Sequence, residues 1–465
     1  MNLKFKATQM YLIIPFLWII SVLSFLNYLS IPINLLMTSI IIIYLCSIAY
    51  KLENSIYFLP YLIVLSPIFG SIDIFGFNLL LSDLIIIFSF FYLLFSRGRK
   101  SVQSKKSFYI LFTLFFFTLL HFIIGDLISL KPAFSIFEIF IVYYLTINSI
   151  DNLNKNFFLN HFCFSVLIGI ILMFLSFYKG INLNDFTVTG GDASKLISEA
   201  KEFNPANYRM SYFYTNFPFL ISSSIFVFLY KIGICKTYIK KSFFIILIIF
   251  VSLALVASGN KTTMVTTLIV FFISNILFRN TGIYRLKTFV YPIVFLPIIY
   301  FLVFNYYITD KSVEGFIKVM SSLGSIEDRI GVYGNAILVL LQNPFRLLTG
   351  FGPDFLTCCG DPVMSRLFKG NLINVFKLNN AVDSGIFTFI IEFGVIPVIM
   401  VLIYLKKLLK KLTKTKEPIN IMFVQFFLVL LIYSILQLVG ISKISWIIVV
   451  FFVMSKNYRI NSLKS

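Results

Sequence analysis

Charged residues are scarce in this sequence. Of its 465 residues, 12% are charged and 59% are hydrophobic, whereas soluble globular proteins are about 25% charged and roughly 45–50% apolar. No soluble fold of this size can hide so much apolar surface from water. The composition therefore excludes a soluble enzyme, a disordered chain and a DNA-binding domain, and it predicts that lipid surrounds most of the chain.

Histidine and cysteine are also rare. The two histidines, His121 and His161, lie within apolar runs, so the usual general base is missing from the polar loops. Of the five cysteines, three (Cys46, Cys163 and Cys235) lie in or beside apolar runs. Cys358 and Cys359 are adjacent in a long polar segment, and adjacent cysteines rarely form an unstrained disulfide. No His or Cys spacing resembles a zinc site. We therefore expect no disulfide framework, no metal ion and no cofactor.

Long apolar runs are the main feature that is present. A spanning helix needs about 20 such residues, and the candidate runs cover residues 8–28, 31–50, 55–70, 79–95, 107–124, 133–149, 157–177, 211–230, 242–258, 262–278, 288–305, 382–405, 419–437 and 441–455. The run at 55–70 is the least certain because it is short and contains Pro60 and Pro67. The sequence predicts an all-α, polytopic membrane protein of about 14 (12–14) helices, with residues 1–465 forming a single transmembrane domain.

The net charge of +20 is explained by membrane orientation. If the N-terminus is cytoplasmic and the spans alternate, the densest basic clusters (97–106, 231–241 and 406–416) all fall on the cytoplasmic side, as the positive-inside rule requires. Both termini are then cytoplasmic. The charge needs no nucleic-acid partner.

Two segments are too long and too polar to be simple connections. They cover residues 178–210 and 306–381, and both fall on the outer side in this topology. Loops of this length are usually functional or disordered. Within the second, residues 329–341 carry apolar side chains at helical spacing. This predicts an amphipathic helix on the membrane surface, ended by Pro344.

Three carboxylates fall within apolar runs: Asp83, Glu138 and Glu392. A charge at the centre of a spanning helix costs about 2.5–3.5 kcal/mol on insertion scales. Such groups face a cavity or a partner. Asp83 and Glu138 are interpreted either as a structural pair or as part of a proton-coupled transport path.

Polar motifs follow one another along the outer side. In order, they are Arg209 to Asn216-Phe217-Pro218; Ser258-Gly259-Asn260-Lys261; Arg329 followed by Asn343-Pro344 and Gly350-Phe351-Gly352-Pro353; and Asp383-Ser384, nine residues and Gly394. This succession resembles the O-antigen polymerase and ligase family. Ligases of that family carry His where this chain has Asp383, so the resemblance favours the polymerase branch.

The resemblance implies a membrane glycosyltransferase with a GT-C-like helical bundle in the bacterial inner (cytoplasmic) membrane. Such an enzyme joins undecaprenyl-diphosphate-linked oligosaccharide repeat units at the outer face, without a metal, in O-antigen or capsule biosynthesis. Its partners are the lipid-linked oligosaccharide, membrane lipid, a flippase and a chain-length regulator. The alternatives are a ligase of the same family and a polysaccharide flippase or other transporter.

The expected chemistry assigns roles to residues of the outer side. Arg209 and Arg329 are the predicted catalytic cations, because guanidinium groups bind phosphate oxygens bidentately and stabilise a diphosphate leaving group. The alternative for each is an anchor to lipid phosphate. Asp383 is the predicted catalytic base, with Asp354 and Glu392 in reserve.

The other predicted substrate-binding residues support these three. Lys261 and Arg346 add positive charge. Gly350 and Gly352 either form turns or let the backbone approach a ligand closely. Asn216 and Tyr333 complete the predicted site.

Overall fold

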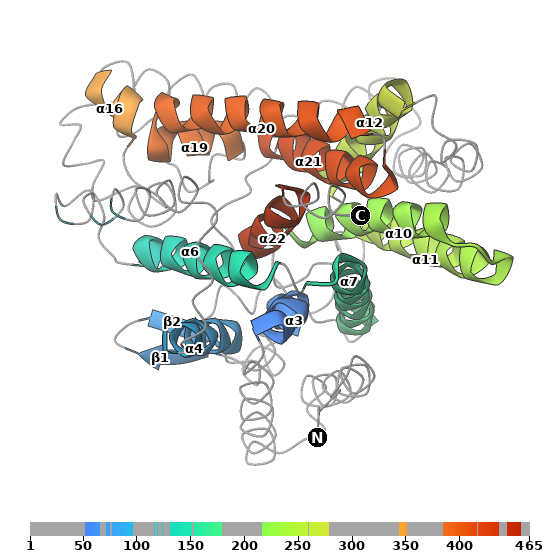
Figure 1. Cartoon of the computed structure of the whole chain (residues 1–465), viewed down its shortest axis with the longest axis horizontal. Coiled ribbons are helices and arrows are strands. Elements are labelled where there is room, and N and C mark those ends of the chain that lie inside the picture. The colour runs from blue at the N-terminus through green and yellow to red at the C-terminus, as the bar shows by residue number, and fades with distance from the viewer. Residues whose placement is uncertain are drawn as a thin grey trace, which may run out of the picture. The chain divides into compact units, whose positions relative to one another are not determined.

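The structure is a computed structural model, and it describes residues 52–65, 71–74, 77–95, 131–150, 153–178, 216–258, 260–278, 344–350, 385–415, 417–436 and 444–456, together with three isolated helical positions, Phe116, Leu119 and Ile123 (Figure 1). The helices are α3 (Leu52–Leu65), α4 (Leu81–Phe95), α6 (Lys131–Ser149), α7 (Lys155–Tyr178), α10 (Phe217–Ile234), α11 (Tyr238–Ala257), α12 (Lys261–Phe278), α16 (Pro344–Thr349), α19 (Gly385–Phe393), α20 (Val395–Thr415), α21 (Pro418–Leu436) and α22 (Ile444–Lys456). The predicted spans at 8–28, 31–50 and 288–305 lie outside the described residues.

Several of these helices have the character of membrane spans. Among the described residues, three are long and apolar enough to cross a bilayer: Lys155–Leu175, Phe217–Ile234 and Tyr238–Ala257. Shorter apolar helical stretches occur at Ser82–Phe91, Phe134–Ser149, Thr262–Phe278, Pro418–Ser434 and Ile444–Ser455. Each coincides with a predicted apolar run. The structure therefore supports a helical membrane protein.

One β-hairpin departs from the all-α prediction. Strands β1 (Ser71–Ile74) and β2 (Phe77–Leu80) pair antiparallel, with Ser71 opposite Leu80 and Asp73 opposite Asn78. Only two residues separate the strands, which is a favoured hairpin connection. Within the predicted run at 55–70, the described residues up to Leu65 are helical, and the hairpin precedes α4. Each strand mixes polar and apolar side chains over four residues, a pattern too short to stand out among apolar runs.

The chain divides into two compact units. The first comprises Met1–Gln103, Ile141–Phe217 and Trp446–Ser465, and the second comprises Ser104–Phe140 and Pro218–Ser445.

In the first unit, α3 packs against α7. Gly169 of α7 makes this close contact possible, because a Cβ there would lie 3.2 Å from a methyl group of Val64 and would overlap the ring of Phe217. Nearer the start of α7, the Tyr61 hydroxyl hydrogen-bonds the His161 Nδ1 at 2.9 Å. Residues from Trp446 onward in α22 join the same unit, where the ring of Phe451 packs on Phe162 at a centroid distance of 5.2 Å.

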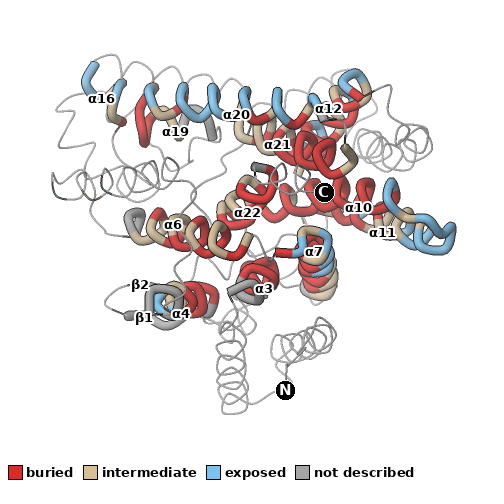
Figure 2. The backbone as a smooth tube through the Cα atoms, in the orientation of Figure 1, coloured by how far each residue is buried: buried red, intermediate tan, exposed pale blue. Residues whose placement is uncertain are grey.

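In the second unit, residues of α10, α12 and α21 form the core; α10 and α21 are buried over most of their length, whereas α12 also has an exposed face (Figure 2). The ring of Phe219 in α10 contacts Tyr433 of α21 with centroids 5.7 Å apart. The hydroxyls of Ser222 in α10 and Thr267 in α12 share a hydrogen bond of 2.7 Å. These contacts put the start of α10, the start of α12 and the end of α21 at one level.

Candidate functional site

Five of the predicted site residues lie within the described part of the chain: Asn216, Lys261, Arg346, Gly350 and Glu392. The others, like the predicted amphipathic helix at 329–341, lie outside it; they are Arg209, Arg329, Tyr333, Gly352, Asp354 and Asp383. Two of the predicted motifs are therefore described in part, the first over residues 344–350 and the second over residues 385–394.

Helix α16 is a short element between Pro344 and Gly350. Pro344 opens it, because proline at the first helical position needs no N–H and its φ is already helical. The predicted helix that Pro344 ends, at 329–341, lies outside the described residues, and α16 begins at Pro344 itself. Gly350 closes α16 with φ 71°, and its N–H donates to the Arg346 carbonyl at 2.7 Å. This single bond is the αL C-cap that glycine adopts without steric cost.

A second glycine breaks the predicted span at 382–405. Gly394 has φ 82°, and its N–H donates to the Ile390 carbonyl at 2.8 Å, so α19 ends there and α20 begins at Val395. Pro397 lies in the first turn of α20 and has no N–H to donate to the Phe393 carbonyl. Residues 385–405 of the predicted run therefore belong to two helices, α19 and α20, separated by Gly394. Gly394-x-x-Pro397 is the sequence signal that predicts the break.

The two glycine turns pack directly against each other's backbone. A Cβ on Gly350 would overlap the Glu392 carbonyl and lie 2.5 Å from the Phe393 nitrogen. A Cβ on Gly394 would overlap the Leu348 carbonyl and lie 2.7 Å from the Thr349 nitrogen. Each position therefore needs glycine for two reasons, its left-handed φ and the absence of a side chain. We call this contact the glycine junction.

Two residues with charged side chains form part of the glycine junction, Arg346 through its guanidinium group and Glu392 through its backbone carbonyl. Arg346 is half-buried, and its Nη1 donates to the Gly350 carbonyl at 3.4 Å. Glu392 is 6% exposed, and its own carbonyl lies against Gly350. Placing a carboxylate in so buried a position is costly, so the junction is a polar site within an apolar surrounding.

This arrangement has a defined chemical capacity. A guanidinium group can bind the oxygens of a phosphate or diphosphate in a bidentate manner. A buried carboxylate can accept a proton from a hydroxyl group. Arg346 and Glu392 provide one group of each kind at one junction. Among the described residues, no cluster of three or more His, Cys, Asp or Glu could hold a metal ion.

Lys261 lies at a different place in the second unit, where α12 begins. The N–H of Thr263 donates to the Asn260 side-chain oxygen at 3.0 Å, which makes Asn260 the N-cap of α12. The hydroxyl of Tyr433 lies at the side chains of Asn260 and Thr263. Sequence reasoning missed Tyr433, because a tyrosine among apolar residues carries no signal until its neighbours are known.

The structure thus brings together only some of the predicted residues. Arg346, Gly350 and Glu392 meet at the glycine junction, whereas Lys261 follows the cap of α12. Asn216 is buried in the turn before α10 and belongs to the first unit. The carboxylates Asp83 and Glu138, considered as a pair, fall in different units.

No known protein family matches the chain, and no curated protein is significantly similar to it.

Proposed function

We propose that the protein is a polysaccharide polymerase that joins polyprenyl-diphosphate-linked oligosaccharide repeat units at the outer face of a bacterial cytoplasmic membrane. The observation that supports this proposal is the glycine junction. Its two sides are the last two motifs of the family pattern, Gly350-x-Gly and the segment ending at Gly394. These motifs are more than 30 residues apart in sequence, yet their backbones touch, as segments of one site would.

The proposed reaction is a glycosyl transfer between two lipid-linked substrates. A hydroxyl oxygen of the acceptor sugar attacks the anomeric carbon of the donor, and the bond between that carbon and the diphosphate oxygen breaks. The electron pair of this bond leaves with the polyprenyl diphosphate, and the proton of the hydroxyl passes to a carboxylate. The enzyme must therefore hold a diphosphate and accept one proton.

The residues available match both requirements. Arg346, with Arg209 and Arg329 from the outer loops, binds the diphosphate oxygens and stabilises the negative charge that develops on them. Asp383 is the proposed proton acceptor. Glu392, in the last turn of α19, is the second candidate for this role.

A transporter is the second candidate function. Buried carboxylates in apolar helices favour it, since Asp83, Glu138 and Glu392 are each 6% exposed or less. Proton-coupled transporters use such groups as proton carriers. A flippase would move the same lipid-linked substrate without breaking the bond to the diphosphate, so the two functions differ in whether the glycan lengthens.

The experiment that separates these functions uses purified full-length protein in proteoliposomes with a polyprenyl-diphosphate-linked repeat unit. A polymerase yields glycans of two or more units with release of polyprenyl diphosphate. A ligase yields no lengthening but transfers the repeat unit from the polyprenyl diphosphate to an added acceptor, and a flippase changes only the leaflet of the substrate. Absence of lengthening by a folded protein would contradict the polymerase proposal.

Deletion of the gene gives the corresponding result in the cell. Loss of a polymerase leaves a single repeat unit on the acceptor and no ladder of chain lengths on a gel. Loss of a ligase leaves polymer on the polyprenyl carrier, and loss of a flippase leaves lipid-linked repeats on the cytoplasmic face. Restoration of the ladder by the wild-type gene, but not by an Arg329→Ala gene expressed at the same level, would assign Arg329 to the reaction.

A further inference from the structure

The C-terminal half of α20 is a helix where the charge pattern indicated a basic loop. The predicted span ended at residue 405 and the basic cluster at 406–416 was placed between spans. In the structure, α20 continues without interruption from Val395 to Thr415. The lysines of the cluster up to Lys414 are therefore held at fixed angles around a helix axis.

Five of these lysines occupy one face. At 100° per residue, Lys406, Lys407, Lys410, Lys411 and Lys414 fall within an arc of about 140°. All five are exposed, and α20 contains no acidic residue. Leu408 and Leu412 lie on the opposite side of the helix and are buried, and α20 packs against α21.

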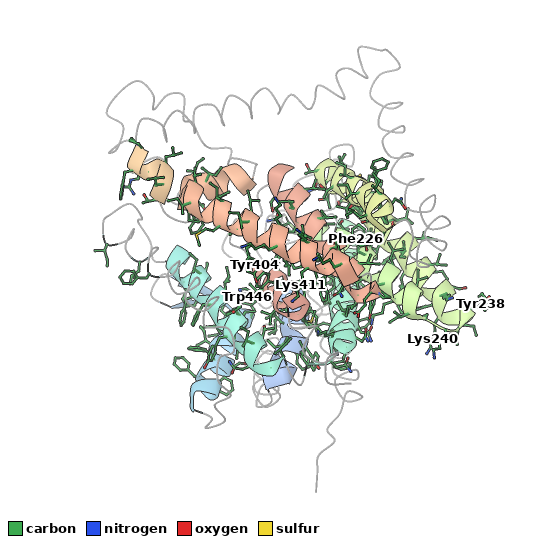
Figure 3. All side chains as sticks on the ribbon, turned by 45° about the horizontal axis from the view of Figure 1, so that its top comes forward. Phe226, Tyr238, Lys240, Tyr404, Lys411 and Trp446 are labelled. Atoms are coloured by element: carbon green, nitrogen blue, oxygen red, sulfur yellow. The ribbon has the colours of Figure 1, made fainter. Side chains whose placement is uncertain are left out.

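The same face is apolar in the first half of the helix. Ile396, Ile399, Met400 and Ile403 fall in the same arc and are exposed (Figure 2). Tyr404 is exposed at the point where the face changes from apolar to basic, and it is marked with Lys411 in Figure 3. One exposed face of α20 is therefore apolar along residues 395–404 and cationic along 406–414.

We propose that the lysine face of α20, formed by Lys406, Lys407, Lys410, Lys411 and Lys414, binds the anionic headgroups of phospholipids. The apolar part of the same face then contacts their acyl chains. Headgroups lie immediately beside acyl chains, so one lipid layer complements both parts. Lysine stems also extend along apolar surface while the ammonium groups reach the headgroups, and tyrosine is typical of this boundary.

An acidic protein is the less suitable partner. Such a protein would match the lysines alone and has no counterpart for the adjoining apolar face, whereas one lipid layer matches both parts. Anionic lipid attracts each nearby lysine, and the attraction decays within a Debye length. Lipid binding by this face is independent of the reaction proposed above, so either proposal can fail alone.

The test measures which lipids remain bound to the purified full-length protein. The protein is placed in nanodiscs of equal amounts of phosphatidylcholine and phosphatidylglycerol, extracted in mild detergent, and analysed by mass spectrometry for retained lipid. We expect the wild type to retain phosphatidylglycerol preferentially, with the preference falling as salt is raised. Replacing Lys406, Lys407, Lys410 and Lys414 by Gln should reduce the preference at least about fivefold.

Two matched variants decide whether the face itself matters. The test variant carries Lys406→Gln and Lys410→Gln, and the control variant carries Lys236→Gln and Lys240→Gln, so both lose the same charge. Lys236 is exposed in the turn between α10 and α11, and Lys240 is exposed at the start of α11. The α20 pair should reduce the preference several times more than the other pair. Equal effects of the two pairs would show that only net charge matters, and an unchanged preference in the fourfold variant would also overturn the proposal.

A charge-conserving variant guards against misfolding. With all four lysines replaced by Arg, the positive charge of the face is retained, and we expect the phosphatidylglycerol preference to be retained with it. Loss of the preference in this variant, with monodisperse protein on a sizing column, would contradict binding by charge.

Discussion

Gly350 ends helix α16 and Gly394 ends helix α19, and each glycine packs against the backbone at the end of the other helix. Gly350 lies against the Glu392–Phe393 peptide, and Gly394 lies against the Leu348–Thr349 peptide. The contact is reciprocal and involves main chain on both sides, so neither segment can shift without the other. It fixes Arg346 and Glu392 at one site.

Replacing either glycine of the junction by alanine should destabilise the protein. The left-handed φ costs roughly 1–2 kcal/mol for an L-residue, and the added Cβ overlaps a carbonyl group, so we expect a loss of at least about 2 kcal/mol. Thermal unfolding in detergent measures it. Gly233→Ala in α10 is the control, because Gly233 is exposed on a helix and alanine favours the helix there. Equal melting temperatures for all three variants would exclude the close backbone packing at the glycine junction.

Arg346→Ala should reduce polymer formation without lowering stability. Removing one preorganised donor to a developing negative charge typically lowers the rate by about 10²–10³-fold. Arg346→Lys should recover only part of the activity, since an ammonium group lacks the bidentate fork. Chain lengths produced in proteoliposomes are the readout, and the melting temperature is the control. Normal chain lengths in the alanine variant would remove Arg346 from the site.

Tyr61→Phe should destabilise the first unit. The substitution removes the 2.9 Å hydrogen bond to His161 and leaves a buried ring nitrogen without this partner, at a cost of about 1–3 kcal/mol. The midpoint of thermal unfolding should fall accordingly. Tyr238→Phe is the matched control because Tyr238 is 86% exposed. A fall of the same size in the control would mean that the hydrogen bond is not the cause.

The hydroxyls of Ser222 and Thr267 should be energetically coupled. In membrane helices such bonds contribute on average about 0.6 kcal/mol, and at most roughly 1.7 kcal/mol. The measurement is a double-mutant cycle of unfolding free energies with Ser222→Ala, Thr267→Val and the combined variant. Because Thr267 also donates to the Thr263 carbonyl at 2.6 Å, only the coupling term reports the contact between α10 and α12. Strictly additive single effects would show that the bond contributes nothing.

Much of the helical arrangement follows from local pattern. The runs at 157–177, 211–230, 242–258 and 262–278 coincide with α7, α10, α11 and α12, because a helix satisfies its backbone groups within one segment and a lipid-facing run need only be apolar. The hairpin at 71–80 was missed. Its strands are four residues each, and their pairing depends on the partner strand rather than on composition.

The candidate site was predictable only in part. Arg346, Gly350 and Glu392 were selected from motif order and chemistry, but nothing in the sequence indicated that Gly350 touches Glu392. The sequence predicts that Pro344 ends a helix at 329–341, which lies outside the described residues, and α16 begins at Pro344 because proline fits the first turn of a helix. Tyr433 was not selected, because its contacts come from Asn260 and Thr263, far away in the chain.

The sequence by itself determined that this protein belongs in lipid and where most of its apolar helices begin and end, since both depend on residues that are neighbours in the chain. It also contained Gly394 and Pro397, which are enough to interrupt a helix. Only the tertiary structure decided what that interruption is for. A glycine with positive φ is tolerated in any loop. At Gly350 and Gly394, however, the backbone of the other segment leaves no room for a side chain, and this packing exists only because two segments more than 40 residues apart in the sequence meet.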